Sequence, residues 1–415
     1  MADTANNSRS NADANSLENK VGIHIKRFIT GLPAVPTLIG VILGFALCSI
    51  LGRVTASAFN FSRFERFFRA IQPQGSFYPT ASELVSHVRR KIPKNKILVL
   101  VGGASYFRGT GQNPDELWTL ELQNLLGDEY RVVNFAIDQA GITDFAGAAF
   151  QVLAREYPRM IYLSNMGASL NGGDGVDGGE TYRYVFWDAY YKDMLKGDKV
   201  WQEDVKLRRS AELKTLPGLE LHLGKYIDSY TYACDLWNYI GYRYLMTIWS
   251  DSTVGSTFLN RRSYTDAIDP NFAQQQIATR SDKEYTKTME ERNKDYFQHG
   301  TYIDKDGQVK LWIDSWNNAS DQINHLFPAD LHKKCLMIIL HGNHYFMKSL
   351  TASDWKRYDL MYKTSLEICQ KVGYPAIEVG ADFSADDYID AGHFMASGGR
   401  KIAHHVADKI KEIVK

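Results

Sequence analysis

The chain has 415 residues, 44% of them hydrophobic and 13% aromatic, and its 48 basic and 48 acidic side chains cancel to a formal net charge of zero. This composition excludes a chain that is disordered throughout, and the absence of a Lys- or Arg-rich run argues against nucleic acid as a partner. Four cysteines without CxxC spacing predict neither a disulfide scaffold nor a zinc site.

The N-terminal region divides into a polar tail and an apolar segment. The first 20 residues are nearly all small and polar, so we expect 1–27 to be a disordered tail. No charged residue occurs over the 24 positions from Phe28 to Leu51, whereas about 20 apolar residues cross the bilayer core. We therefore predict a single transmembrane anchor over 28–52, uncleaved because a long tail precedes it. Basic residues balance across this anchor and leave its orientation open: Arg9, Lys20, Lys26 and Arg27 before it, Arg53, Arg63, Arg66 and Arg69 after it.

The juxtamembrane segment 53–93 contains an aromatic and basic stretch, Phe59–Ile71, in which five phenylalanines alternate with arginines. Beside a membrane anchor, such a stretch is typical of an amphipathic helix that lies in the interface. A stalk helix that packs on the following domain explains the pattern equally well, and both interpretations stay open.

The segment 94–415 alternates short apolar runs with helical patterns. Strands separated by helices are typical of βαβ units, so we predict a three-layer α/β/α sandwich with a parallel sheet. A long insertion over about 171–330 interrupts this domain and is expected to be mostly helical. The predicted strands are Lys96–Val101, Arg131–Asn134, Met160–Ser164, Cys335–Leu340 and Ala376–Val379, with helices over Pro114–Leu126 and from Ser397 onward.

Polar residues follow several of these strands, where open α/β sheets bind their ligands. Ser105 lies in a glycine-rich turn after the first strand, and Asp390 and His393 lie just before the last helix. A serine hydroxyl becomes a nucleophile when a histidine takes its proton and a carboxylate orients that histidine. We therefore predict Ser105 as the nucleophile, His393 as the base and Asp390 as its partner.

The order of these blocks resembles that of the SGNH (GDSL-like) hydrolases. Gly103-Ala104-Ser105 resembles their first block with Ala in place of Asp, and Asp390-Ala391-Gly392-His393 matches their last block. The resemblance implies that Asn165, in Leu163-Ser164-Asn165-Met166, contributes to an oxyanion hole, and it implies an SGNH or flavodoxin-like fold. In the second block Gln139 stands where the family has glycine, so Gly141 is the predicted second oxyanion residue.

One predicted membrane span joined to such a domain also resembles the bacterial membrane-anchored SGNH proteins. These work with membrane-bound O-acyltransferases to modify cell-surface polymers. The resemblance implies an inner-membrane, single-pass protein with a periplasmic domain, a membrane-bound O-acyltransferase as partner and an acylated glycan as substrate. Some members of this group have degraded sites, so an inactive protein remains an alternative.

Other motifs give weaker predictions. His341, Asn343 and His344 follow the fourth strand, and Asn134 ends the second, so these four residues are the predicted substrate contacts. A merely structural role for the His341–His344 loop stays open. Two histidines without a third ligand do not predict a metal site, and no Gly-rich phosphate-binding motif occurs, so no cofactor is expected.

The insertion is rich in tyrosine and tryptophan. These side chains suit both sugar binding and a helical core, and both explanations stay open. Its Gly172–Asp177 stretch matches one unit of a calcium-binding repeat, which needs stacked neighbours, so we interpret it as a flexible loop over the site.

These patterns together predict a membrane-anchored serine esterase or O-acyltransferase that acts on acyl esters of a surface glycan. The alternative is a catalytically silent, SGNH-like subunit that binds or assembles a surface-polymer modification or export complex. A requirement for Ser105 would separate the two.

Overall fold

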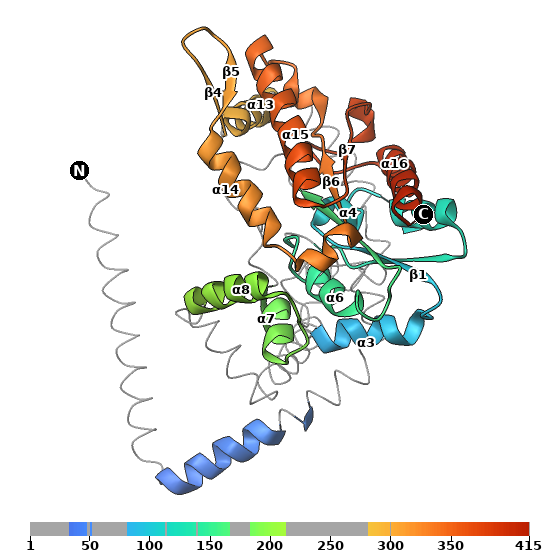
Figure 1. Ribbon diagram of the computed structural model, residues 1–415, viewed down its shortest axis with the longest axis vertical. Coiled ribbons are helices and arrows are strands. Elements are labelled where there is room, and N and C mark those ends of the chain that lie inside the picture. Colours follow the sequence, from blue (N-terminus) through green and yellow to red (C-terminus); the bar gives the residue numbers. More distant parts are fainter. Residues whose placement is uncertain are drawn as a thin grey trace, which may run out of the picture.

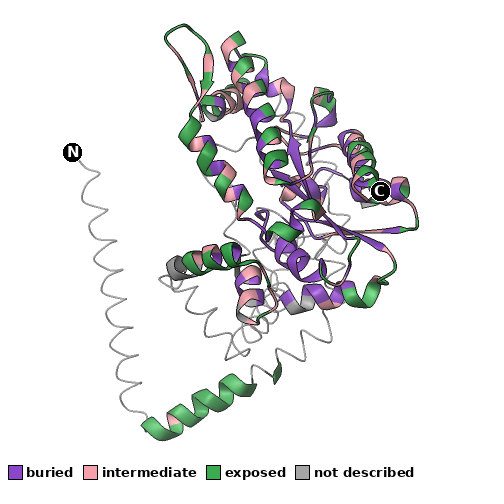
Figure 2. Ribbon diagram, viewed as in Figure 1, coloured by how far each residue is buried: buried purple, intermediate pink, exposed green. Residues whose placement is uncertain are grey.

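The structure is a computed structural model that describes residues 33–47, 50–51, 81–112, 114–137, 140–166, 183–212, 281–298 and 300–414. The predicted tail, both ends and two inner residues of the predicted anchor, and most of the juxtamembrane segment therefore lie outside the described residues. Residues 34–47 form a helix with nearly all side chains exposed (Figure 2). In the part of the chain that the structure describes, no helix is both long enough and apolar enough to span a bilayer.

Five parallel strands form the central sheet in the order β2–β1–β3–β6–β7 (Figure 1). This order places the carboxyl ends of β1 and β3 side by side near the middle of the sheet, because Val101 pairs with Leu163. The strands are β1 (Ile97–Val101), β2 (Tyr130–Asn134), β3 (Ile161–Met166), β6 (Cys335–Leu340) and β7 (Ala376–Val379).

Both faces of the sheet are covered by helices, and each face has its own hydrophobic core. The alternation of side chains along β1 shows this, since Leu98 and Leu100 belong to one core while Ile97, Val99 and Val101 belong to the other. The first core is covered by α3 (Ala81–Lys91), α6 (Ala146–Leu153) and α15 (Ala352–Val372), and the second by α5 (Trp118–Leu126) and α16 (Ala396–Val414).

The inserted region contributes helices and one small hairpin to the described structure. Its helices are α7 (Arg183–Tyr191), α8 (Lys199–Glu212), α13 (Lys283–Gln298) and α14 (Ile313–Asn324). The antiparallel pair β4 (Thr301–Ile303) and β5 (Val309–Leu311) was not predicted, because three-residue strands are too short to show a period. Short segments complete the fold: α4 (Ser105–Arg108), η2 (Pro114–Glu116), η4 (Ala329–Lys334), η5 (His344–Met347) and η6 (Ala385–Asp387).

The parallel-sheet α/β sandwich predicted from the sequence is confirmed, and the β6 and β7 boundaries match the predicted strands. The prediction for β3 was too short: the strand continues through Asn165 and Met166, which pair with Ile338 and Ile339 on β6. Cys335 and Cys369 are buried free thiols, whereas Cys48 and Cys234 lie outside the described residues.

Candidate active site

Ser105 is the first residue of the short helix α4, directly after the turn that ends β1. The turn is tight because Gly103 has φ +85°, and a Cβ atom there would lie 2.1 Å from Asn165 Oδ1. Only glycine takes this backbone conformation at little cost and leaves room for Asn165. The local sequence therefore presents the Ser105 side chain at the carboxyl edge of the sheet.

Asp390 and His393 lie in a small hairpin between η6 and α16. Tyr388 and Phe394 close it as an antiparallel bridge, and the Ile389 N–H donates to His393 O at 2.9 Å. Asp390 Oδ1 accepts from the Gly392 and His393 N–H groups at 2.9 and 2.8 Å. One carboxylate oxygen thus shapes the turn and leaves the other oxygen for the imidazole.

The three predicted catalytic residues form one continuous hydrogen-bonded chain. Asp390 Oδ2 lies 2.7 Å from His393 Nδ1, and His393 Nε2 lies 2.8 Å from Ser105 Oγ. With the Nδ1 proton donated to Asp390, Nε2 is left to accept from the Ser105 hydroxyl. This is the arrangement in which a histidine can take a proton from a serine.

The electrostatics of this chain favour an ionised Asp390. Burial raises the pKa of its carboxyl, but the hydrogen bond and charge of His393 and the two backbone N–H donors outweigh burial, so the pKa is lowered from its ordinary value. A carboxylate at this position stabilises the imidazolium that forms when His393 accepts a proton.

Tyr106 covers His393, and the sequence analysis did not predict it. The two rings stack with centroids 5.0 Å apart and 24° between their planes. A Cβ atom at Gly392 would lie 2.5 Å from the Tyr106 ring, so this glycine allows the stack. Burial, followed by the charge of Asp390, raises the pKa of Tyr106. The sequence offers no signal for this contact beyond adjacency to Ser105.

Asn165 joins β3 to the turn of residues 102–104 that precedes Ser105, which we call the nucleophile turn. Its Oδ1 atom accepts the Ala104 N–H at 2.8 Å, and the residue is 8% exposed. Because Oδ1 is used in this way, the remaining polar group of the side chain is the Nδ2 donor. The Ser105 N–H lies in the first turn of a helix, where backbone donors have no intrahelical acceptor.

Gly141 and Asn134, the predicted oxyanion and substrate residues, both make hydrogen bonds within the protein. The Gly141 N–H donates to Asp144 Oδ2 at 3.4 Å, within its own loop. Asn134 donates through Nδ2 to Phe107 O at 3.0 Å and accepts the Ala136 N–H at 3.0 Å. Asn134 therefore links the end of β2 to α4, and Gln139 lies outside the described residues.

The loop after β6 contacts the hairpin that carries Asp390 and His393. His341 is 5% exposed, and its ring nitrogens contact Glu378 Oε1 and the Tyr358 hydroxyl. Asn343 is 1% exposed and donates to Asp390 O at 3.0 Å. Both side chains are buried and form hydrogen bonds with other residues of the protein. His344 is half-buried, and burial followed by the charge of His341 lowers its pKa.

The inserted helix α13 also reaches this region. The Tyr285 ring contacts Phe346 of η5 at 5.9 Å between centroids, and Asn293 donates to Phe346 O at 3.0 Å. Burial raises the pKa of Tyr285, with a further contribution from the charge of Asp390, while Arg292 opposes the shift. The insertion therefore contributes a tyrosine and an arginine close to the Asp390 side of the site.

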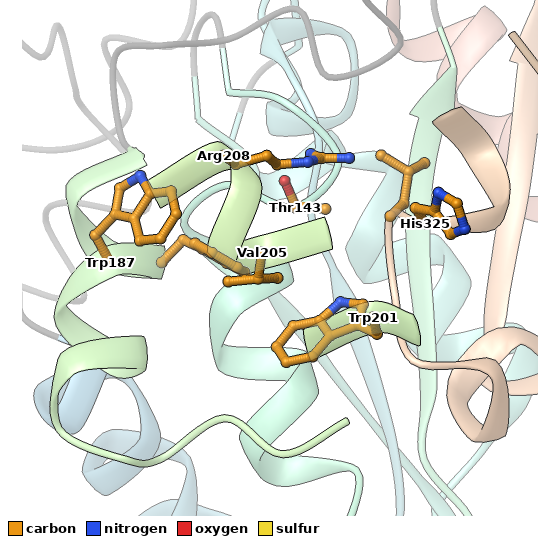
Figure 3. A pocket seen from close by; sticks show the side chains of 8 residues that line it. Thr143, Trp187, Trp201, Val205, Arg208 and His325 are labelled. Carbon is orange, nitrogen blue, oxygen red and sulfur yellow. The ribbon is translucent and has the colours of Figure 1, made fainter. Parts of the chain in front are cut away.

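Two insertion tryptophans are core residues in the described structure. Trp187 and Trp201 are 1% and 3% exposed and pack with Val205 in a separate cluster. They border a small pocket with Arg208 and Thr143 (Figure 3). For these two residues the core explanation holds. The Gly172–Asp177 stretch and Trp237, Tyr239, Tyr242, Tyr244 and Trp249 lie outside the described residues.

Within the described ranges, no three His, Cys, Asp or Glu side chains come together as a set that could hold a metal ion. No protein-family model matches the chain, and no curated protein matches it either. Among solved structures, the chain is similar to the native aryl esterase of M. smegmatis, with a TM-score of 0.29 and 10% sequence identity. The match covers 76% of this chain and 99% of that one, and at this score it assigns no function or residue role.

Proposed function

We propose that the protein is a membrane-anchored serine esterase or O-acyltransferase that acts on acyl esters of a cell-surface glycan. The observation that carries this proposal is the hydrogen-bonded chain from Asp390 through His393 to Ser105. Ser105 and His393 are 288 positions apart in the sequence, and the fold brings them together. A serine, a histidine and a carboxylate in this geometry are the groups that activate a serine nucleophile.

The first half of the reaction forms an acyl-enzyme. Ser105 Oγ attacks the ester carbonyl carbon while its proton passes to His393 Nε2, and Asp390 stabilises the resulting imidazolium. The tetrahedral intermediate then collapses, its C–O bond to the alcohol breaks, and His393 returns the proton to that leaving alcohol. An acyl ester on Ser105 and a neutral His393 remain.

The second half transfers the acyl group. Water or a glycan hydroxyl gives its proton to His393 Nε2 and attacks the Ser105 ester, and collapse of the second intermediate returns that proton to Ser105 Oγ. Water gives hydrolysis, and a glycan hydroxyl gives O-acyl transfer. The same residues serve both reactions, so the acceptor decides between them.

The negative oxygen of each intermediate needs donors close to Ser105. The Asn165 Nδ2 group and the Ser105 N–H are the donors that we assign to it, because Asn165 Oδ1 already holds the Ala104 N–H. Gly141 is a poorer candidate in this conformation, since its N–H donates to Asp144. Loss of one such donor costs about 10²–10³-fold in rate in serine hydrolases.

The cellular setting of the proposal rests on the sequence. An uncharged run from Phe28 to Leu51 suits an inner-membrane anchor, and we place the α/β domain in the periplasm. A membrane-bound O-acyltransferase would supply the acyl group there, and Tyr285 and Arg292 of α13 would border the glycan. No nucleic acid takes part.

A fluorophosphonate probe tests the nucleophile directly, with the full-length chain in mild detergent. We expect the wild type to be labelled and Ser105→Ala to be unlabelled, because only an activated serine attacks the phosphorus atom. Ser353→Ala is the matched control, since Ser353 is a partly exposed serine in the first turn of α15, and it should label like the wild type. Equal labelling of Ser105→Ala and wild type would contradict the proposal.

A catalytically silent binding or assembly subunit is the second candidate. The observation that favours it is the Gly141 N–H, which donates to Asp144 in place of an oxyanion. In that case Ser105→Ala would support normal glycan acylation in cells that lack the wild-type protein. Loss of acylation at normal protein abundance would exclude this candidate.

A further inference from the structure

The loop between β6 and η5 holds the hairpin that carries Asp390 and His393. The Asn343 N–H donates to Ala391 O at 2.9 Å, and Asn343 Nδ2 donates to Asp390 O at 3.0 Å. Asn343 Oδ1 accepts the Tyr345 N–H at 2.9 Å, which fixes the orientation of the side-chain amide. One buried residue thus donates to two successive carbonyls of the hairpin.

The loop is itself anchored to the core through His341. Its ring contacts Glu378 of β7 and Tyr358 of α15 and stacks on Tyr362 with centroids 4.1 Å apart. The Tyr388 hydroxyl, at the base of the hairpin, donates to His341 O at 3.0 Å. Asn343 therefore connects the hairpin to a loop that is itself anchored to β7 and α15.

The hairpin needs such support because it is short. Its own backbone closure consists of the Tyr388–Phe394 bridge, the Ile389 N–H bond to His393 O and the turn around Asp390, and a two-stranded hairpin depends on contacts with the rest of the fold for its stability. A displacement of about 1 Å between reacting groups costs about 10²-fold in rate. The two Asn343 hydrogen bonds act on the residues next to the imidazole, where such a displacement matters most.

We propose that Asn343 is a positioning residue that holds the Asp390–His393 hairpin in register with Ser105, through the two hydrogen bonds it donates to Asp390 O and Ala391 O. This inference rests on the proposed function for its kinetic consequence, but its structural consequence does not. In this role Asn343 acts through the hairpin, which differs from the substrate contact that its place in the sequence suggested.

The test compares Asn343→Asp with Gln123→Glu in the full-length protein. Asn343→Asp keeps the acceptor for the Tyr345 N–H and loses the side-chain donor. Gln123→Glu makes the same exchange away from the site, where Gln123 Nε2 donates to Gly127 O and Tyr130 O at 3.0 and 3.2 Å. Asn343→Ala removes both the donor and the acceptor of the Tyr345 N–H without adding charge. Tyr388→Phe removes the hydroxyl that donates to His341 O and keeps the aromatic ring.

The kinetic readout is the rate of fluorophosphonate labelling at several probe concentrations. We expect the maximal labelling rate of Asn343→Asp and Asn343→Ala to fall about 10- to 100-fold with unchanged half-saturation, because the nucleophile is misaligned and not blocked. The maximal labelling rate of Tyr388→Phe should fall less, and that of Gln123→Glu should match the wild-type rate. Maximal rates within about twofold of wild type in folded Asn343→Asp and Asn343→Ala would overturn the inference.

A second readout is independent of reactivity. The proton that His393 Nδ1 shares with Asp390 across 2.7 Å should give a resonance far downfield in the ¹H spectrum, and Ser105→Ala should retain it. We expect this signal to weaken or disappear in the Asn343 variants and to persist in Gln123→Glu. Its persistence in every Asn343 variant would overturn the inference, whereas an unlabelled wild type with the signal intact would count against the proposed function alone. If Asn343→Ala fails to fold, Asn343→Asp against Gln123→Glu provides the comparison.

Discussion

The two halves of the candidate site are held in different ways. On one side, Ser105 is positioned mainly by a close approach of the backbone, because the Gly103 turn leaves no room for a side chain against Asn165, which also accepts the Ala104 N–H. On the other side, Asp390 and His393 are positioned by hydrogen bonds, within the hairpin and from Asn343. Adding atoms to the nucleophile turn should therefore lower the stability of the protein. Removing hydrogen-bond donors or acceptors from the hairpin should lower its activity or stability.

The largest expected effect is on the hairpin side. Asp390→Asn keeps the volume of the side chain but offers an N–H donor to His393, which favours the proton on Nε2 and prevents this nitrogen from accepting from Ser105. We expect a loss of about 10⁴-fold in the rate of ester hydrolysis or fluorophosphonate labelling, the size of effect that the same exchange has in other serine triads. An activity within about tenfold of wild type would show that Asp390 does not orient His393.

The nucleophile turn provides the next prediction. Gly103→Ala should destabilise the protein by about 3 kcal/mol, the sum of an unfavourable φ of +85° and a steric clash with Asn165. Gly127→Ala is the control, because Gly127 has φ +77° and an added Cβ atom would meet nothing within 4 Å. It should cost about 2 kcal/mol from backbone strain alone, because its φ of +77° with ψ −170° is a conformation that residues with a side chain rarely adopt. Urea unfolding measures both, and equal losses would mean that the contact with Asn165 carries no energy.

The smallest expected effect concerns Asp387, at the base of the hairpin, and the pH dependence of the protein's stability. Asp387 Oδ2 lies 2.6 Å from Lys401 Nζ, and Met395 donates its N–H to Asp387 O at 2.9 Å. Burial raises the pKa of Asp387, but Lys401 and the Ser384 and Ser397 donors outweigh burial and lower the pKa below its ordinary value of 3.8.

A lowered pKa in the folded state means that Asp387 stabilises the fold fully above pH 3.8 and loses this contribution as the pH falls through the folded-state value. Asp387→Asn should cost about 1–2 kcal/mol at neutral pH and flatten the loss of stability in acid. Asp408→Asn, at an exposed position of α16, is the control and should retain the wild-type acid dependence. Thermal unfolding between about pH 2 and 7 checks this, and equal acid sensitivity of all three proteins would contradict it.

Much of the sheet could be predicted because its signals are local. The β6 run Cys335–Leu340 is apolar at every position, as expected for a strand that is buried on both faces. The glycine-rich turn before Ser105 and the Asp390–His393 block were visible for the same reason, since each is a short pattern with its own turn chemistry. The β4–β5 hairpin and the last two residues of β3 were missed, because pairing partners and not local pattern determine them.

The sequence by itself determined the fold class, the strands that carry the site and the residue types that could form a serine, histidine and carboxylate chain. Only the tertiary structure decided that Tyr106 covers His393, that Asn134 links β2 to α4, that the Gly141 N–H donates to Asp144, and that Asn343 holds the hairpin. The physical reason is range. Periodicity and turn residues act over a few positions, whereas the Asn343–Asp390 bond joins residues 47 positions apart and depends on how the ends of separate strands meet.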